Sequence, residues 1–191
     1  MAEDSNREEQ ALSALMDQLA GSNRRRRQEA ARLVAAIAAA SPDQLLDYTD
    51  DLLEALERPE AQTRWQVLDT LTLMAAVDSD KVAEAFDGAE ASLFDDSSAA
   101  VRLSAFKFLA RLGASSPENA DKVWPLLDEA IQCYHGDPEY HDMLVALLDF
   151  AKGSISPAVA SALRDRVAFD AENGHGYVKG FSAEIIAALA E

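Results

Sequence analysis

The sequence predicts an all-α protein, a right-handed α-α superhelix (solenoid) of about five helical hairpins. Three observations predict it: serines that recur every 36 to 40 residues, polar residues that recur every 37 to 39 residues between them, and a composition suited to helices. The chain has 191 residues, is 49% hydrophobic and contains only 8 Gly and 6 Pro. Because few glycines and prolines interrupt it, helix is favoured over strand.

Five serines are predicted to start the first helix of each hairpin. A Ser hydroxyl accepts a hydrogen bond from a free backbone N–H in the first turn of a helix, and Pro fits the next position. Three of the serines precede Pro, and Ser5 and Ser41 have the capping-box spacing to Glu8 and Gln44. An apolar stripe at helical spacing follows each serine. The five are Ser5, Ser41, Ser79, Ser116 and Ser156.

A second register of polar residues predicts the second helix of each hairpin. Four of the five are followed three positions later by an apolar residue, and a short break rich in Gly, Pro, Asp, Asn or Ser precedes each helix. The register residues are Arg27, Arg64, Arg102, His141 and Lys179. The unit is therefore helix, turn, helix, in a single domain over 1–191 with repeats at about 5–40, 41–78, 79–115, 116–155 and 156–191.

The third repeat resembles the second half of a HEAT repeat, of the HEAT/armadillo-like helical-repeat family. The residues that carry the resemblance are Asp96, Val101, Arg102, Ala105, Leu109 and Gly113. In that family an Asp stands in the hairpin turn, a Val-Arg pair opens the second helix, and Asp and Arg form ladders between repeats. His141 and Lys179 stand where the pattern has Arg. The resemblance implies a superhelical scaffold, with first helices on its convex face and second helices on its concave face.

The polar positions of the second helices are the candidate binding surface. One row lies one position after the register residues: Gln28, Trp65, Leu103, Asp142 and Gly180. A second row lies five positions after them: Arg32, Asp69, Lys107, Ala146 and Glu184. From these rows we predict six partner-binding residues: Trp65, Asp69, Leu103, Lys107, Arg32 and Asp142. Trp65 is the most informative, because an aromatic side chain facing solvent is a common interface anchor. Alternatively it caps the core between two repeats.

Four consecutive arginines open one second helix. Cations at a helix N-terminus interact unfavourably with the macrodipole, so helix stability does not explain these arginines. Arg24, Arg25, Arg26 and Arg27 are therefore a candidate patch for an anion or an acidic partner, together with the exposed N–H groups of the helix end. Alternatively they pair with nearby acids of this acidic chain.

No residue pattern in the sequence predicts catalysis, a metal or a cofactor. His135, His141 and His175 form no HExxH pattern and no His-Glu pair of the kind found in iron-dependent HEAT-repeat hydroxylases. Cys133 and His135 are two residues apart and do not face each other on a helix, which disfavours a Cys-His nucleophile. The glycines form no phosphate-binding loop. We expect no enzyme activity.

The net charge disfavours two classes of partner, and the N-terminal sequence and the cysteine content indicate the compartment. The formal net charge of −17 disfavours phosphate backbones and membrane surfaces. The acidic, polar N-terminus is unlike a signal peptide, no apolar run is long enough to span a membrane, and the single Cys forms no internal disulfide. We expect a soluble cytoplasmic protein.

The sequence leads to one function hypothesis and two alternatives. The first is a non-catalytic scaffold or adaptor that holds a peptide or helix of another protein on its concave face. The second is a nucleic-acid enzyme resembling the DNA-alkylation-repeat glycosylases, which needs a basic groove. The third is a structural subunit that docks through its arginines or through its C-terminal Phe181, Ile185 and Leu189.

Overall fold

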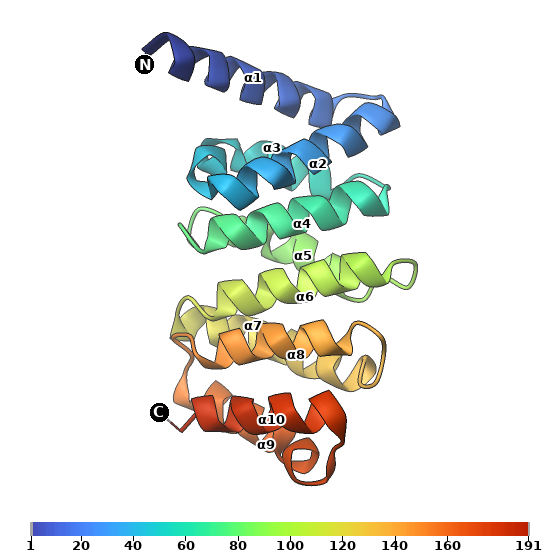
Figure 1. Ribbon diagram of the computed structural model, residues 1–191, viewed down its shortest axis with the longest axis vertical. Coiled ribbons are helices and arrows are strands. Elements are labelled where there is room, and N and C mark those ends of the chain that lie inside the picture. Colours follow the sequence, from blue (N-terminus) through green and yellow to red (C-terminus); the bar gives the residue numbers. More distant parts are fainter. Residues whose placement is uncertain (1, 191) are drawn as a thin grey trace. The chain divides into compact units, whose positions relative to one another are not determined.

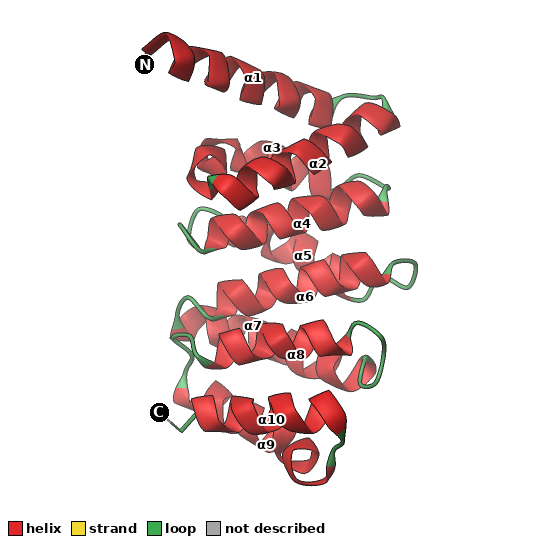
Figure 2. Ribbon diagram, viewed as in Figure 1, coloured by secondary structure: helices red, strands yellow, loops and turns green. Residues whose placement is uncertain are grey.

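The computed structural model describes residues 2–190, with side chains over 9–190. Helices and turns account for the described residues, and no strand occurs among them (Figures 1 and 2). The first helix of each hairpin is α1 (Ala2–Ala20), α3 (Thr49–Leu56), α5 (Phe86–Leu93), α7 (Pro117–Cys133) or α9 (Pro157–Asn173). The second is α2 (Arg24–Ala40), α4 (Ala61–Ala75), α6 (Ala99–Gly113), α8 (Tyr140–Ala151) or α10 (Gly176–Ala188). Short 3-10 helices η1 (Pro42–Tyr48) and η2 (Ala83–Ala85) precede α3 and α5.

The predicted all-α fold of helical hairpins is confirmed, and the second register locates its second helices. Each of the five register residues lies in the first turn of a second helix. A cation in the first turn of the second helix can reach the backbone carbonyl groups of the preceding hairpin turn, which explains why polar residues recur at this position. Arg27 Nη1 donates to Gly21 O at 2.8 Å, Arg102 Nη1 to Asp95 O at 2.9 Å, and Lys179 Nζ to Glu172 O at 2.9 Å.

The serine register is right at Ser116 and Ser156, right as a helix start but not as a capping bond at Ser41, and wrong at Ser5 and Ser79. Ser116 and Ser156 are N-caps that accept from the backbone N–H of Asn119 and Val159, with Pro at the next position. Ser41 lies between α2 and η1 and makes no capping bond with its side chain. No helix begins at Ser79, because the chain there forms a turn that Asp78 closes by accepting from Lys81 N at 3.0 Å.

The prediction that the first helix begins at Ser5 is also wrong. Because α1 begins at Ala2, Ser5 lies inside the helix rather than at its start. The side chains of Ser5 and Glu8, and so their predicted capping box, lie outside the described residues.

The described chain divides into two compact units, residues 1–88 and 89–191, with the division inside α5. In unit 1, α2 packs against α1 and α4, and α3 packs against α1 and α4. Its core is built of aliphatic side chains that are fully buried, among them Leu19, Leu45, Leu52, Leu68, Leu71 and Met74. Two layers result, one of first helices and one of second helices.

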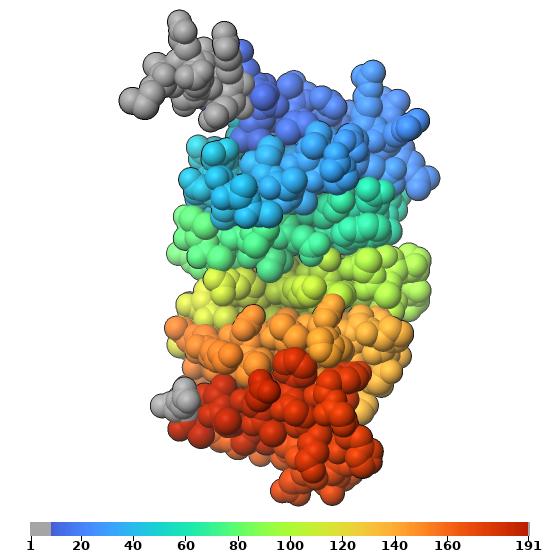
Figure 3. Space-filling model, viewed as in Figure 1, coloured from blue at the N-terminus to red at the C-terminus, as the bar shows by residue number. Residues whose placement is uncertain are grey.

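Unit 2 repeats the arrangement with an aromatic core. Here α8 packs against α6 and α10, while α7 packs against α9 and α6. The core includes Phe106, Phe108, Tyr140 and Phe150. For unit 2 by itself, Figure 3 shows the side on which its second helices lie. Within residues 2–190, none of the helices combines the length and apolar character needed to cross a membrane.

Candidate functional site

All ten positions of the two predicted rows reach solvent; in each unit taken by itself, we call the surface formed by these positions the second-helix face. In unit 1, Gln28 and Trp65 are half-buried, whereas Arg32 and Asp69 are exposed. In unit 2 the half-buried members are Leu103, Lys107 and Ala146, and the exposed members are Asp142, Gly180 and Glu184. Because every second helix turns the same two positions outward, the register sets which side chains a partner can reach.

The outer ridge of α4 carries more apolar surface than the two rows contain. Trp65 and Asp69 continue at four-residue spacing into Leu73, which is 39% exposed, and Val77 beyond the helix end, which is 51% exposed. Residues four apart lie next to each other on a helix, so Trp65, Asp69 and Leu73 form one ridge, and Val77 follows it in the turn after α4. Sequence reasoning missed Leu73 and Val77, although their spacing from Trp65 could have found them.

Arg32 is already engaged within its own helix. Its Nη2 lies 2.6 Å from Glu29 Oε1, and its Nε lies 3.1 Å from Glu29 Oε2. The hydrogen bond from Arg32 lowers the pKa of Glu29, and the same bond raises the pKa of Arg32. Both side chains are more than half exposed, so the pair neutralises a charge on the surface without burying it.

The four arginines of α2 divide into one structural residue and three surface residues. Arg27 is 7% exposed and bonds to Glu60, the N-cap residue of α4, as well as to Gly21 O. The prediction of a four-arginine patch is therefore wrong for Arg27, which follows the alternative of pairing with an acid. Its hydrogen bond holds the pKa of the Glu60 carboxyl below the usual value.

The other three arginines are exposed at the start of α2. Asn23 caps this helix, because its Oδ1 accepts from Arg26 N at 3.1 Å. A shallow cavity of about 290 Å³ lies here, lined by Gln18, Asn23, Arg25, Arg26 and Glu29. Since Glu29 is bonded to Arg32, the acid at this cavity does not neutralise the arginines. Anion binding here stays a prediction.

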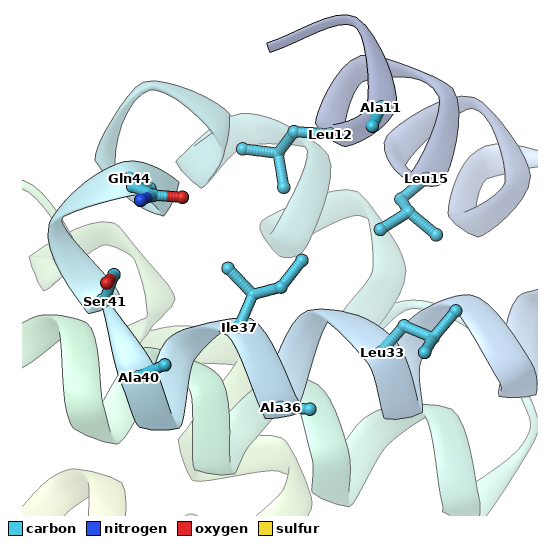
Figure 4. A pocket seen from close by; sticks show the side chains of 9 residues that line it. All are labelled: Ala11, Leu12, Leu15, Leu33, Ala36, Ile37, Ala40, Ser41 and Gln44. Carbon is cyan, nitrogen blue, oxygen red and sulfur yellow. The ribbon is translucent and has the colours of Figure 1, made fainter. Parts of the chain in front are cut away.

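An apolar cavity of about 520 Å³ lies between α1, α2 and η1 in unit 1 (Figure 4). Leu12 and Leu15 of α1 point across it toward Leu33 and Ile37 of α2. Its lining is Ala11, Leu12, Leu15, Leu33, Ala36, Ile37, Ala40, Ser41 and Gln44. The apolar stripe predicted after Ser5 contains these leucines, but the open space beside them was not predicted.

Unit 2 contains a second arginine-glutamate pair like that of Arg27. Arg102 binds Glu139 Oε1 through Nη2 at 2.5 Å and Nε at 3.2 Å, and its guanidinium lies 4.9 Å from the ring centre of Tyr134. The resemblance implied an Asp-Arg ladder with Asp96. The acid is instead Glu139, the N-cap residue of α8, because that position brings a longer side chain to the arginine of the preceding hairpin.

Asp142 of unit 2 lies beside a group of aromatic rings. Its Oδ1 is 2.9 Å from His141 Nδ1, and the His141 ring touches two rings of α10. Sequence reasoning missed this group, since it treated His141 as a structural register residue and Phe181 as a docking residue. Ile185, named with Phe181, is fully buried and cannot dock to a partner.

The remaining reactive side chains are placed apart. Cys133 is exposed at the end of α7, and His135 Nε2 lies 2.9 Å from Asp170 Oδ2. Among the residues with described side chains, no group of three or more His, Cys, Asp or Glu residues is placed to hold a metal ion.

Comparisons with solved structures identify the fold. A designed armadillo repeat protein in complex with the peptide (KR)4 superposes with a TM-score of 0.77 at 17% identity, over 94% of this chain and 82% of that chain. The fold is a HEAT/armadillo-like helical repeat. Computationally designed armadillo repeat proteins for modular peptide recognition give 0.74 at 18% identity, over 93% of this chain and 82% of theirs.

A third similar structure is an engineered protein with a TM-score of 0.75 at 21% identity, over 93% of this chain and 80% of that chain. No model of a known protein family matches the sequence, and no curated protein matches it. The likeness to the armadillo repeats is therefore one of fold, carried by hairpin geometry rather than by shared residues.

Proposed function

We propose that this protein is a non-catalytic scaffold that binds a peptide or helix of a partner protein on its second-helix face. The observation that carries the proposal is the ridge of α4 with the turn after it, where Trp65, Leu73 and Val77 keep apolar surface in contact with water beside Asp69. Exposed apolar groups next to a charged rim are typical of protein-binding surfaces.

The fold supports the same proposal. Similar structures include a designed armadillo repeat protein in complex with a peptide, so this arrangement of hairpins can present a peptide-binding surface. A repeat protein offers such a surface because equivalent positions recur along it. The predicted binding residues Leu103, Lys107 and Asp142 hold those equivalent positions in unit 2.

The charges of the second-helix face disfavour the alternative of a nucleic-acid enzyme. Of its cations, Arg32 is bonded to Glu29 and Lys107 is half-buried. Asp69, Asp142 and Glu184 are exposed on the same face, where they repel phosphate groups. We expect no shift of a labelled DNA duplex or RNA in a gel at low salt, where non-specific binding is strongest.

Partner capture by Trp65 variants tests the proposal. The chain is immobilised, exposed to extract of its native cells, and the retained proteins are identified and then purified for direct binding. We expect Trp65→Ala to weaken direct binding of the partner roughly tenfold or more, as truncation of an aromatic anchor does. Helical circular dichroism should be unchanged.

Phe169→Ala is the matched control. Phe169 is 72% exposed on α9, in the layer of first helices, so this change removes an exposed aromatic side chain outside the second-helix face. The control should bind the partner as the wild type does. Equal binding by the Trp65→Ala and wild-type chains would overturn the proposal.

A further inference from the structure

Three partly exposed rings meet on the second-helix face of unit 2. The His141 ring of α8 lies 5.2 Å from that of Tyr177 and 5.3 Å from that of Phe181, both on α10, at interplanar angles of 67° and 88°. The His141 side chain is 49% exposed and Tyr177 is 42% exposed. These rings form an aromatic surface that solvent reaches.

Next to the rings, one face of α10 has no side chain at Gly180. Tyr177, Gly180, Phe181 and Glu184 are spaced at i, i+3, i+4 and i+7, so they share one face of α10. A Cβ atom at Gly180 would meet no atom within 4 Å. Since Gly weakens a helix interior relative to Ala and packing leaves this space open, the fold does not require glycine here.

Carboxylates flank this open space, and the nearest cation on α10 is engaged elsewhere. Asp142 is 53% exposed and bonds to His141 through Oδ1 alone, while Glu184 is exposed one turn beyond Gly180. Lys179 donates from Nζ to Glu172 O in the hairpin turn. The rings thus have a carboxylate bonded to one of them and another on the same face of α10, a combination that attracts cations.

We propose that His141, Asp142, Tyr177, Gly180 and Glu184 form a binding site for an arginine side chain of the partner peptide. The proposal rests on the proposed function and specifies the partner: a peptide with exposed arginine. A guanidinium is planar, so it can lie over the bare helix at Gly180, stack on an aromatic ring and pair with a carboxylate at its edge. A lysine ammonium matches only the charge.

Binding of defined peptides to the full chain tests the site. The probes are a fluorescent octapeptide with four arginines, the same peptide with the arginines replaced by citrulline, and the same peptide with lysines. Citrulline keeps the length and planarity of arginine and removes its charge. We expect the citrulline peptide to bind roughly tenfold weaker and the lysine peptide to bind several-fold weaker than the arginine peptide.

Gly180→Leu separates the site from general attraction between an acidic protein and a basic peptide. The change fills the open space without altering charge, and the absence of any neighbour within 4 Å predicts that the helix tolerates it. Arginine-peptide affinity should fall roughly tenfold. Ser161→Leu, at an exposed position of α9, is the matched control and should bind as the wild type does.

The outcomes separate this proposal from the scaffold proposal. If Gly180→Leu binds the arginine peptide as tightly as the wild type, or if the citrulline peptide binds equally well, the arginine site is wrong even when Trp65→Ala abolishes partner binding. If Gly180→Leu weakens the arginine peptide and Trp65→Ala leaves partner binding intact, unit 2 still has a binding site for arginine, but the proposal that the partner binds through the α4 ridge falls.

Discussion

Arg27 and Arg102 hold the same place in two hairpins and make the same two kinds of bond. Each donates to a carbonyl of its own hairpin turn and to the N-cap glutamate of the next second helix, Glu60 or Glu139. Both glutamates are buried. The arginine therefore fixes the turn and at the same time links one repeat to the next within its unit.

Removing one partner of such a pair leaves the other charge buried. We expect Arg27→Ala to lower the free energy of unfolding by about 3–5 kcal/mol, the range found for broken buried ion pairs. Arg25→Ala, which removes an exposed arginine two residues away, should change it by less than about 0.5 kcal/mol. Urea unfolding of both variants checks this, and equal stabilities would contradict the structural role of Arg27.

The same pair makes part of the stability depend on pH. Because the pKa of Glu60 is lowered in the folded chain, its contribution is present above the usual value of 4.5 and is lost as the pH falls through the folded value. Between pH 6 and pH 3 we expect Glu60→Gln to lose less stability than the wild type. A parallel fall in both proteins would show that Glu60 does not carry this dependence.

The candidate site was predictable at this scale only in part. The rows named Asp142 correctly as solvent-facing, since helical spacing decides which side chains point outward, whereas Trp65 is half-buried. The burial of Arg27 and the ring contacts of His141 were not predictable, because they depend on residues 33 to 40 positions away in sequence. Spacing within a helix says nothing about such partners.

At the scale of the element, the observed helix starts show which of the predicted serines cap a helix and which do not. Ser116 and Ser156 cap helices that begin with Pro and pack into the core, whereas Ser41 and Ser79 precede 3-10 or turn structure. The period of about 38 residues was nevertheless predicted correctly, because the second-helix register alone carries it. The serine register and the second-helix register have nearly the same period, but the serines do not all mark the start of an α-helix.

Cap removal distinguishes these serines. We expect Ser116→Ala to cost about 1 kcal/mol of unfolding free energy, since it removes the bond to Asn119 N. Ser41→Ala should cost less than about 0.5 kcal/mol, because its side chain makes no capping bond. Thermal and urea unfolding of the two variants measure the difference, and a larger loss at Ser41 would contradict the assignment.

Two glycines in second helices should respond to alanine in opposite directions. At the end of α6, a Cβ on Gly113 would collide with Val123 and lie 2.8 Å from Phe150, so Gly113→Ala should destabilise by about 1–3 kcal/mol. Gly180 has open space and should gain about 0.5–1 kcal/mol from the better helix former. Melting temperatures that shift in the same direction would refute this packing account.

At the scale of the whole molecule, charge decides what the surface can bind. The chain carries 34 acidic and 17 basic residues, and several of its arginines are engaged in pairs, so exposed acids dominate. A basic segment of a partner is attracted to such a surface, and polyanions are repelled. Charge alone does not choose the binding face, which we propose is set by the apolar ridge of α4 and the rings of unit 2.

The same charge should make stability depend on salt. Self-repulsion in a folded chain of net charge −17 is screened as ionic strength rises. We expect the urea concentration at the midpoint of unfolding to rise between 20 mM and 500 mM NaCl, because salt screens this repulsion. A midpoint that falls over this range would show that the ion pairs outweigh the repulsion.

The central claim is that the second-helix face binds the partner. Hydrogen exchange of the full chain, with and without the purified partner, tests it most directly because it reports every helix in one experiment. We predict slower exchange in α4, α6, α8 and α10 on binding, with no change in α1, α7 and α9. Protection confined to those first helices would contradict the claim.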